Sequence, residues 1–237
     1  MRGIPKTLQL LVVLVFCFTT LAFAEDGTGV KLISQGSVMA AGGFPYKIAQ
    51  PGSYKLSSNL IVPANVIGIV ISADNVTLEL NGFSIIGQQG SGSVGIYGGY
   101  SDDVTVLNGS VVGMGGNGVS LYGNGILVEK VHAKLNNTGI YLTGSGVVRD
   151  CTAVSNSHGF AVTGFVVEGN SASFNGIGFD VVGSTMIANT AYRNTYGLAA
   201  WNSVYGSNTF YQNSGGDLLS SINATFQNNN NCSGTTC

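Results

Sequence analysis

Aromatic side chains recur at fixed offsets from a repeated glycine, and they are the residues best suited to bind a sugar. Tyr97 and Tyr141 follow their glycine by two residues, whereas Tyr122 and Trp201 follow theirs by four. An aromatic ring offers a large amphipathic plane at low entropic cost, so rings along one rigid face can stack on sugar rings. With Asp180, which shares the two-residue offset, they form a predicted carbohydrate-binding face. Aromatic residues also favour strands in general, so simple covering of an outer sheet is the alternative.

Acid–base chemistry has weaker support. Cleavage of a glycosidic bond usually needs two carboxyl groups about 5 to 10 Å apart. Asp180 has no acidic neighbour at its own offset, where Tyr141, Ala161 and Ala199 fill the nearby repeats. His158 stands at a predicted corner without acidic partners around it. We therefore expect no catalytic residues.

The densest group of acidic residues lies at another predicted corner. Asp74 aligns with Asp102, Asn75 aligns with Asp103, and Asn124 continues the column one repeat later. Calcium accepts six to eight oxygen ligands in flexible geometry, so Asp74, Asp102 and Asp103 are candidate calcium ligands. Asp and Asn are also the usual turn formers, and an ordinary turn is the preferred interpretation. We expect no cofactor, with calcium as the one candidate metal.

Repeated glycines predict the elements that position these side chains. Their successive spacings are 27, 23, 21, 20, 19, 19 and 19 residues. A period of this length, filled with strand-like sequence, is typical of a solenoid whose units must stack to bury their apolar faces. The glycines are Gly68, Gly95, Gly118, Gly139, Gly159, Gly178, Gly197 and Gly216.

Each repeat is predicted to form three short strands separated by corners. Positions one and three after the glycine are nearly always apolar while position two varies, which is the pattern of a strand with one buried face. Two polar columns recur in register, and stacking at about 4.8 Å would let their amides bond along the axis as ladders. One column is Asn136, Asn156, Asn175, Asn194 and Asn213. The other is Asp150, Asn170, Asn189 and Asn208.

This organisation resembles the right-handed parallel β-helix, or pectate-lyase-like, superfamily, which includes pectin-cleaving enzymes, phage tail fibres and adhesins. Residues 51–60 and 73–87 look like the start of many exported bacterial β-helix repeat proteins of unassigned function. The resemblance covers residues 51 to about 225 and implies an all-β, three-sided solenoid of about eight coils of 19 to 27 residues. The Asp, His and Arg-Lys motifs of pectin hydrolases and the arginine motif of pectate lyases are missing.

The chain divides into four predicted parts. Residues 1–24 combine Arg2 and Lys6 with a short apolar run and a small-residue exit, which is typical of a cleaved signal peptide. Residues 25–67 are predicted as an N-terminal cap with the first strands, 68–225 as the β-helix and 226–237 as a polar tail. Within the tail, the spacing of Cys232 and Cys237 favours a local disulfide in an exported protein.

Composition limits the partners. Removing the signal peptide leaves seven basic side chains against 11 acidic ones, which argues against nucleic acid because that partner demands a basic face. No second apolar run reaches membrane-spanning length, so we expect a soluble chain that is secreted, periplasmic or at the cell surface. The oligomeric state is left open.

Three functions compete on these observations. The leading hypothesis is a secreted, non-catalytic β-helix that serves as a rigid extracellular scaffold and binds polysaccharide through the outward aromatic residues. The alternative is a polysaccharide-acting enzyme, a lyase, hydrolase or epimerase, because a fold does not determine a function. The third hypothesis is a purely structural or adhesive stack.

Overall fold

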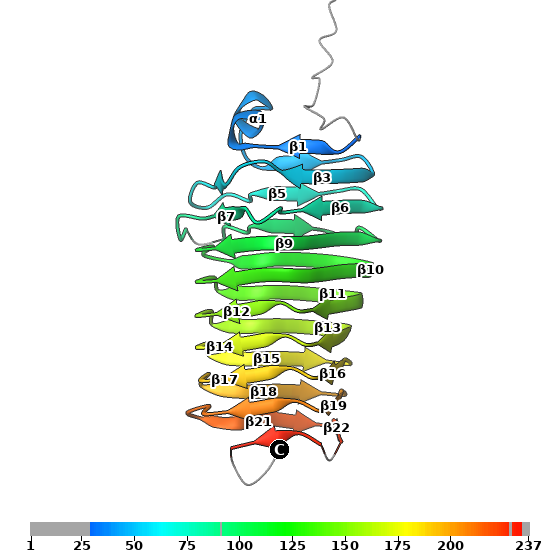
Figure 1. The fold of residues 1–237 in the computed structure, drawn as a ribbon, viewed down its shortest axis with the longest axis vertical. Coiled ribbons are helices and arrows are strands. Elements are labelled where there is room, and N and C mark those ends of the chain that lie inside the picture. The colour runs from blue at the N-terminus through cyan, green and yellow to red at the C-terminus, as the bar shows by residue number, and fades with distance from the viewer. Residues whose placement is uncertain (1–28, 91, 228, 234–237) are drawn as a thin grey trace, which may run out of the picture.

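The strands stack as successive turns of one right-handed parallel β-helix (Figure 1). The structure, a computed structural model, describes residues 29–90, 92–227 and 229–233 of the 237-residue chain. The all-β solenoid is thus confirmed, with about 10 turns instead of eight. The glycines undercount the turns because the first ones, formed by β1 to β4, precede Gly68.

Strands at equivalent positions form three parallel columns, here called faces 1, 2 and 3. Face 1 contains β2 (Tyr46–Ile48), β5 (Ile69–Ile71), β8 (Ile96–Gly98), the first part of β10 (Asn117–Lys134), β11 (Thr138–Arg149) and β13 (His158–Glu168), then β15 (Ile177–Val182), β18 (Tyr196–Trp201) and β21 (Gly216–Ile222). Face 2 contains β1 (Lys31–Ile33), β3 (Gly52–Leu56), β6 (Val76–Glu79), the start of β9 (Val104–Val112), later parts of β10, β11 and β13, then β16 (Thr185–Ile187), β19 (Val204–Gly206) and β22 (Thr225–Phe226). Face 3 contains β4 (Leu60–Ile61), β7 (Ser84–Ile86), the ends of β9 and β10, β12 (Thr152–Val154), β14 (Ser171–Ser173), β17 (Thr190–Tyr192), β20 (Thr209–Tyr211) and β23 (Asn231–Cys232).

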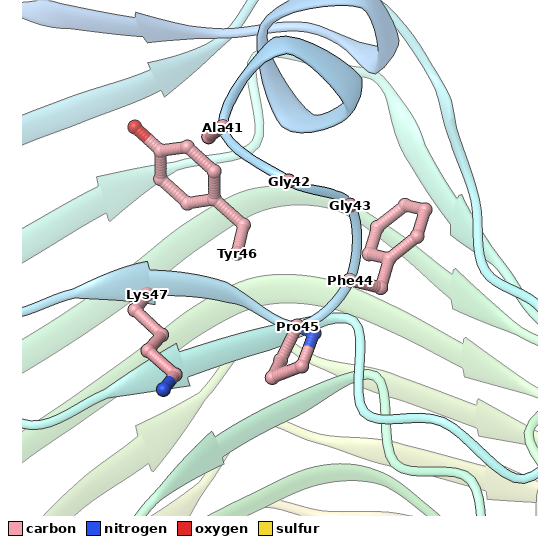
Figure 2. A pocket seen from close by; sticks show the side chains of 7 residues that line it. All are labelled: Ala41, Gly42, Gly43, Phe44, Pro45, Tyr46 and Lys47. Atoms are coloured by element: carbon pink, nitrogen blue, oxygen red, sulfur yellow. The ribbon is translucent and has the colours of Figure 1, made fainter. Parts of the chain in front are cut away.

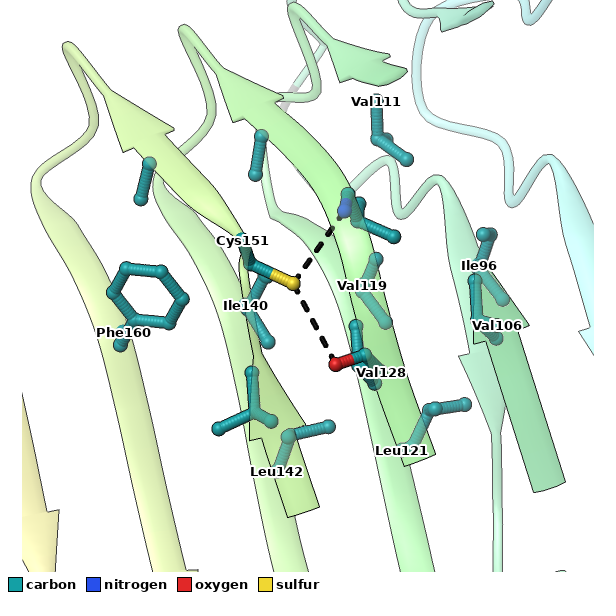
Figure 3. Close-up of a cluster of buried hydrophobic side chains, with 14 of the residues drawn as sticks. Ile96, Val106, Val111, Val119, Leu121, Val128, Ile140, Leu142, Cys151 and Phe160 are labelled. Carbon is teal, nitrogen blue, oxygen red and sulfur yellow. Dashed lines mark hydrogen bonds between the residues drawn. The ribbon is translucent and has the colours of Figure 1, made fainter. Parts of the chain in front are cut away.

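Inward side chains of the three faces fill a continuous apolar core (Figure 3). In-register positions bring like residues together, and the rings of Phe160 and Phe179 stack with centroids 4.9 Å apart and planes at 8°. Both side chains are fully buried. Full burial of a large apolar side chain contributes about 1.5 to 3 kcal/mol, so these rows hold the coils together.

Seven of the eight predicted glycines occupy one column, where the next coil approaches too closely for a side chain. A Cβ on Gly139 would lie 2.6 Å from the carbonyl oxygen of Gly159, and the contact recurs from Gly68 to Gly178. The eighth assignment is wrong by one residue. Gly197 faces the carbonyl oxygen of Asp217, because the coil that starts at Gly197 holds one more residue than the two before it.

The first predicted asparagine ladder is present at the corner between faces 3 and 1. The Asn175 amide nitrogen Nδ2 donates to Oδ1 of Asn194 and to the Ala153 carbonyl, both at 3.0 Å. Its Oδ1 accepts from the backbone nitrogen of Asn156 at 2.9 Å and from Nδ2 of Asn156 at 3.0 Å. Since Asn175 is 3% exposed, these bonds satisfy groups that water does not reach.

The second ladder, between faces 2 and 3, contains Asn170, Asn189 and Asn208 as predicted, but not Asp150. Cys151 occupies that position, and its backbone nitrogen donates to Oδ1 of Asn170 at 3.0 Å. The prediction failed because a register shift between Thr143 and Gly146 adds a residue earlier in that coil. Asp150 instead adopts the left-handed backbone conformation before the ladder, with φ of 53°.

A third ladder, which the sequence analysis did not predict, joins faces 1 and 2. The Ser184 hydroxyl accepts from the backbone nitrogens of Gly164 and Phe165, while the backbone nitrogen of Ser184 donates to Oγ of Ser203 at 3.1 Å. Each of the three corners of the later coils therefore carries its own stacked polar side chain.

Both ends of the stack contain residues that the sequence placed outside the repeats. Helix α1 (Gln35–Ala40) lies over the first turns (Figure 1), and its N-cap Ser34 forms a capping box with Ser37. At the other end, β23 adds a strand to face 3. The predicted signal peptide and Cys237 lie outside the described residues, so the signal peptide and the Cys232–Cys237 disulfide stay predictions.

Candidate functional site

Four tyrosines gather on the outside of face 1, and we call Tyr97, Tyr100, Tyr122 and Tyr141 the tyrosine cluster. The Tyr122 ring lies 6.1 Å from that of Tyr97, 6.2 Å from that of Tyr100 and 5.6 Å from that of Tyr141. In the strand register, Ser120 separates Tyr97 from Tyr141. The small, buried Ser120 leaves room for the neighbouring rings, so residues from three coils form one aromatic surface.

Backbone conformation and burial fix the orientation of these rings. A Cβ on Gly99 would come within 2.9 to 3.3 Å of the Tyr97 side chain, so this glycine gives the ring its space. Tyr97, Tyr122 and Tyr141 are partly buried, and burial is the main cause that raises the pKa of Tyr122. Tyr100 is 90% exposed. The cluster thus presents phenol rings to solvent, with Tyr100 the most exposed of the four.

The other two predicted sugar-binding residues lie further along the axis. Asp180 shares the outward row of Tyr141, with Ala161 between them, so it lies two coils away. Trp201 shares the row of Tyr122 and lies four coils away, or about 19 Å at the usual strand spacing. The structure therefore brings three of the five predicted residues together and adds Tyr100, which the offset analysis missed.

Asp180 lies close to His158, which was expected to have no acidic partner. Its Oδ2 lies 4.0 Å from Nε2 of His158 on the preceding coil. Burial raises the pKa of Asp180, and the nearby His158 opposes that rise. Ala161 and Ala199 flank Asp180 in its row, so no second carboxyl group occupies the adjacent positions of this row. The pair supplies one carboxylate and one imidazole.

At the predicted calcium corner, carboxylates bond to the backbone of the next coil. Asp74 Oδ1 accepts from the backbone nitrogen of Asp102 at 2.9 Å, and Asp102 Oδ1 accepts from that of Asn124 at 2.7 Å. The Ser145 hydroxyl continues the series by donating to Oδ1 of Asn124. No group of three or more His, Cys, Asp or Glu side chains suited to a metal occurs in the described part of the chain. Calcium binding by Asp74, Asp102 and Asp103 stays a prediction.

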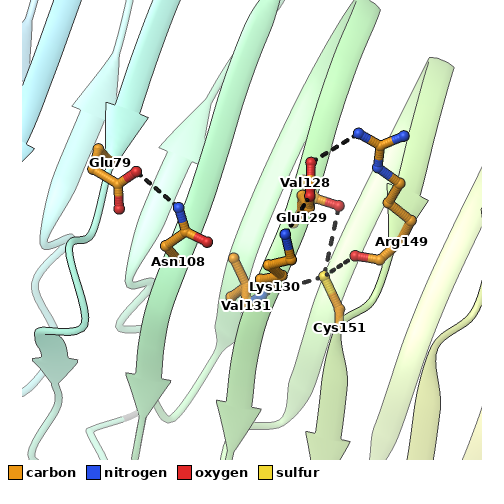
Figure 4. Close-up of polar contacts among 8 residues, drawn as sticks. All are labelled: Glu79, Asn108, Val128, Glu129, Lys130, Val131, Arg149 and Cys151. Atoms are coloured by element: carbon orange, nitrogen blue, oxygen red, sulfur yellow. Dashed lines mark hydrogen bonds and ion pairs between the residues drawn. The ribbon is translucent and has the colours of Figure 1, made fainter.

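Charged side chains on face 2 form a small network around Glu129 (Figure 4). Its carboxylate lies 3.0 Å from Nζ of Lys130 and 2.9 Å from a terminal nitrogen of Arg149. Hydrogen bonds from Lys130 and then from Arg149 lower the pKa of Glu129. A carboxylate held in its ionised form by two cations is poorly suited to act as a general acid.

A cavity of about 400 Å³ lies beside the N-terminal coil and is lined by residues 41–47 (Figure 2). Tyr46 contributes a buried hydroxyl that has no hydrogen-bond partner among the described residues, and burial raises its pKa. Lys47 is the one charged residue in the lining. Without a carboxylate or an imidazole, the lining offers no acid–base pair.

A second aromatic group lies at the corner between faces 3 and 1. Phe174, Tyr192 and Tyr211 come from three successive coils, and the last two rings stack at 5.7 Å with planes at 7°. These rings were not predicted, because they lie outside the outward positions of the first strand of each coil. The signal was present, since Tyr192 and Tyr211 are 19 residues apart, which is the period of the later coils.

Comparisons with known proteins support the fold alone. No protein-family model matches the chain, and no curated protein matches it. Among solved structures, the chain is similar to the crystal structure of the Dettilon tailspike protein, with a TM-score of 0.54 and 16% sequence identity. The match covers 86% of this chain and 53% of the tailspike, so the chain spans about half the tailspike's length. In the described residues, no helix has the length and apolar character needed to cross a membrane.

Proposed function

We propose that this protein is an exported, non-catalytic β-helix scaffold that binds a neutral polysaccharide through the tyrosine cluster. The contiguity of four outward rings across neighbouring coils carries the proposal. Because coils repeat at about 4.8 Å, a sugar polymer lying along the axis meets a ring on each of the three coils of the cluster. Aromatic faces contribute large apolar area at low entropic cost.

The charges around the cluster favour a neutral ligand. Lys47 lies in the same outward row as Tyr97 but two coils away, whereas Asp102 and Asp103 follow Tyr100 in the chain after Ser101 alone. Two exposed carboxylates beside the most exposed ring repel a polyanion. The cluster therefore suits hydroxyl-bearing sugars without acidic groups.

Export rests on the predicted signal peptide. The low proportion of charged residues, 8%, and the polar ladders at the corners suit a rigid module outside the cell. If the chain is exported, mass spectrometry of the mature protein will show loss of residues 1–24. Recovery of the uncleaved chain in the cytoplasm would contradict export.

Calorimetric titration with neutral glucan and galactan oligosaccharides tests the binding proposal. Tyr122 is the central ring, so Tyr122→Ala should weaken binding about tenfold, which corresponds to about 1.4 kcal/mol. Thr163→Ala is the matched control, because Thr163 occupies the same row two coils away. Equal affinity of wild type and Tyr122→Ala, or no binding by the wild type, would contradict the proposal.

The pairing of His158 with Asp180 favours a polysaccharide-acting enzyme as the second candidate. A proton could pass between bound sugar and this pair, although hydrolysis usually needs a second carboxyl group. Incubation of the purified chain with neutral and acidic polysaccharides, with and without calcium, separates the candidates. The scaffold proposal predicts no shortened or unsaturated product, whereas product formation that Asp180→Asn abolishes would establish the enzyme.

A further inference from the structure

Phe174, Tyr192, Arg193 and Tyr211 form an exposed group, here called the corner patch, that serves no evident role in the fold. Phe174 is 54% exposed and Tyr211 is 48% exposed. The Phe174 ring meets that of Tyr192 edge-on at 6.2 Å, and the Tyr192 and Tyr211 rings stack in parallel. Such rings form a continuous aromatic surface along three coils.

Phe174 is an unexpected residue for its position. It has a φ of 58°, a left-handed conformation that costs a non-glycine residue about 1 to 2 kcal/mol. The same corner position is left-handed in Leu135, Ser155 and Gln212, so the turn itself does not require an aromatic residue. Neither the left-handed backbone conformation nor burial explains a phenylalanine at this position. Contact with a ligand is the remaining role for its ring.

Arg193 adds a positive charge with free hydrogen-bonding capacity. Its guanidinium lies 4.9 Å from the centre of the Tyr192 ring, and Nε donates to Oε1 of Gln212 at 3.0 Å. Gln212 in turn donates to the Tyr211 hydroxyl at 3.1 Å, which ties the guanidinium to the stacked rings. In the described part of the chain, no carboxylate forms an ion pair with Arg193. Its two terminal nitrogens can therefore receive a carboxylate in bidentate fashion.

Acidic residues are missing from the described strands of the face that holds the corner patch, although the whole chain has a net charge of −2. The described strands of face 3 carry His132 and Lys134 and contain no Asp or Glu. The carboxylate nearest in sequence to Tyr211 is Asp217, which is 7% exposed and accepts from Asn213 and Ser233. An anion approaching Arg193 thus meets no exposed carboxylate on this face.

We propose that the corner patch is a second binding site, specific for a polysaccharide whose sugar rings carry carboxylates. A ring stacks on the Tyr192 and Tyr211 side chains, while its carboxylate binds the terminal nitrogens of Arg193. This site lies on a different face from the tyrosine cluster and has the opposite local charge. It does not depend on the neutral-sugar site and can be tested separately.

The test uses an oligomannuronate and the same oligosaccharide after chemical reduction of its carboxyl groups. Wild type should bind the acidic form, and the reduced form should bind at least about tenfold more weakly. Arg193→Gln and Tyr192→Ala should each weaken binding of the acidic form about tenfold. Arg149→Gln is the matched control, because Arg149 is an exposed arginine on face 2, and it should leave binding unchanged. Thermal unfolding of each variant verifies the fold.

Three results would overturn the proposal. The first is no binding of the oligomannuronate by wild type, and the second is equal loss in Arg193→Gln and Arg149→Gln, which indicates unspecific charge attraction. The third is a dimer of this chain that Tyr192→Ala dissociates in light-scattering chromatography, since the patch would then be a protein interface. Tyr122→Ala should bind oligomannuronate like wild type, so failure of the neutral-sugar proposal leaves this one intact.

Discussion

The asparagine ladder from Asn136 to Asn213 and the aromatic rings of the corner patch arise from the same stacking, yet they face opposite environments. Inside, every polar atom of the Asn175 amide is bonded to protein. Outside, the Arg193 guanidinium hydrogen-bonds to the described residues through Nε alone, and Phe174 is 54% exposed. The inner rows use the register for stability, whereas the outer rows leave their bonding groups free for a ligand.

Removing one aromatic ring from the core and one from the outer surface gives the largest expected difference in stability. Phe179→Ala should lower the free energy of unfolding by about 3 to 5 kcal/mol, because it opens a cavity beside Phe160 in a fully buried row. Tyr192→Ala should cost about 1 kcal/mol or less, as expected for an outer cross-strand pair. Chemical denaturation measures both. Equal losses would show that the outer rings are part of the stabilising structure.

Two asparagines at the same corner give the next largest contrast. Asn175→Ala removes the acceptor for two donors of Asn156 and the donor to Ala153, so we expect a loss of roughly 2 to 4 kcal/mol. Asn137→Ala, at an exposed position, should stay within about 0.5 kcal/mol of wild type. Thermal unfolding by circular dichroism distinguishes them. A ladder that contributes little would tolerate Asn175→Ala as well as Asn137→Ala.

Phe174→Gly tests whether Phe174 lowers the stability of the fold while it contributes to ligand binding. Glycine removes the cost of a left-handed phenylalanine but adds backbone entropy to the unfolded state, so the net gain should be up to about 1 kcal/mol. Binding of oligomannuronate should weaken in the same variant. Destabilisation without any effect on binding would assign Phe174 to the fold instead.

Asp180→Asn gives the smallest effect, and its sign depends on pH. Because burial raises the pKa of Asp180, the folded state binds its proton more tightly than the unfolded state. Stability therefore falls as pH rises from the ordinary Asp pKa, near 3.8, through the folded value, and the loss persists above it. Asp180→Asn should raise the melting temperature at pH 7 and gain less at pH 3. An equal gain at both pH values would contradict an effect of ionisation.

Local spacing in the sequence determined most of the inner architecture. The glycine column from Gly68 to Gly197 and the Asn136 ladder follow from residue type and period, because close backbone approach admits only glycine and a buried stack needs self-complementary amides. The errors arise where one coil gains a residue. In this way Cys151 occupies the ladder position predicted for Asp150, and Asp217 occupies the column position predicted for Gly216.

The outer surface was harder to predict, because no packing constraint selects its residues. The tyrosine cluster was predicted in part, since three of its members lie at fixed offsets from a glycine. Tyr100 was missed because it lies five residues after Gly95, outside the two offsets considered, and its own backbone is left-handed, with φ of 56°. The pairing of His158 with Asp180 joins different offsets on adjacent coils, so column-by-column alignment could not show it.

The register itself is the premise of both binding proposals, and spin-label distances measure it most directly. Ser110, Thr190 and Thr209 lie in one outward row of face 3, four and five coils apart. Burial raises the pKa of the Cys151 thiol to about 12, so this cysteine should not react, and labelled wild type serves as the blank for other sites. Pulsed electron paramagnetic resonance on two doubly labelled variants should give narrow distance distributions. We expect about 19 Å for Ser110→Cys with Thr190→Cys and about 24 Å for Ser110→Cys with Thr209→Cys. Broad distributions, or separations that do not grow by about 5 Å for the extra coil, would contradict the stacked rows.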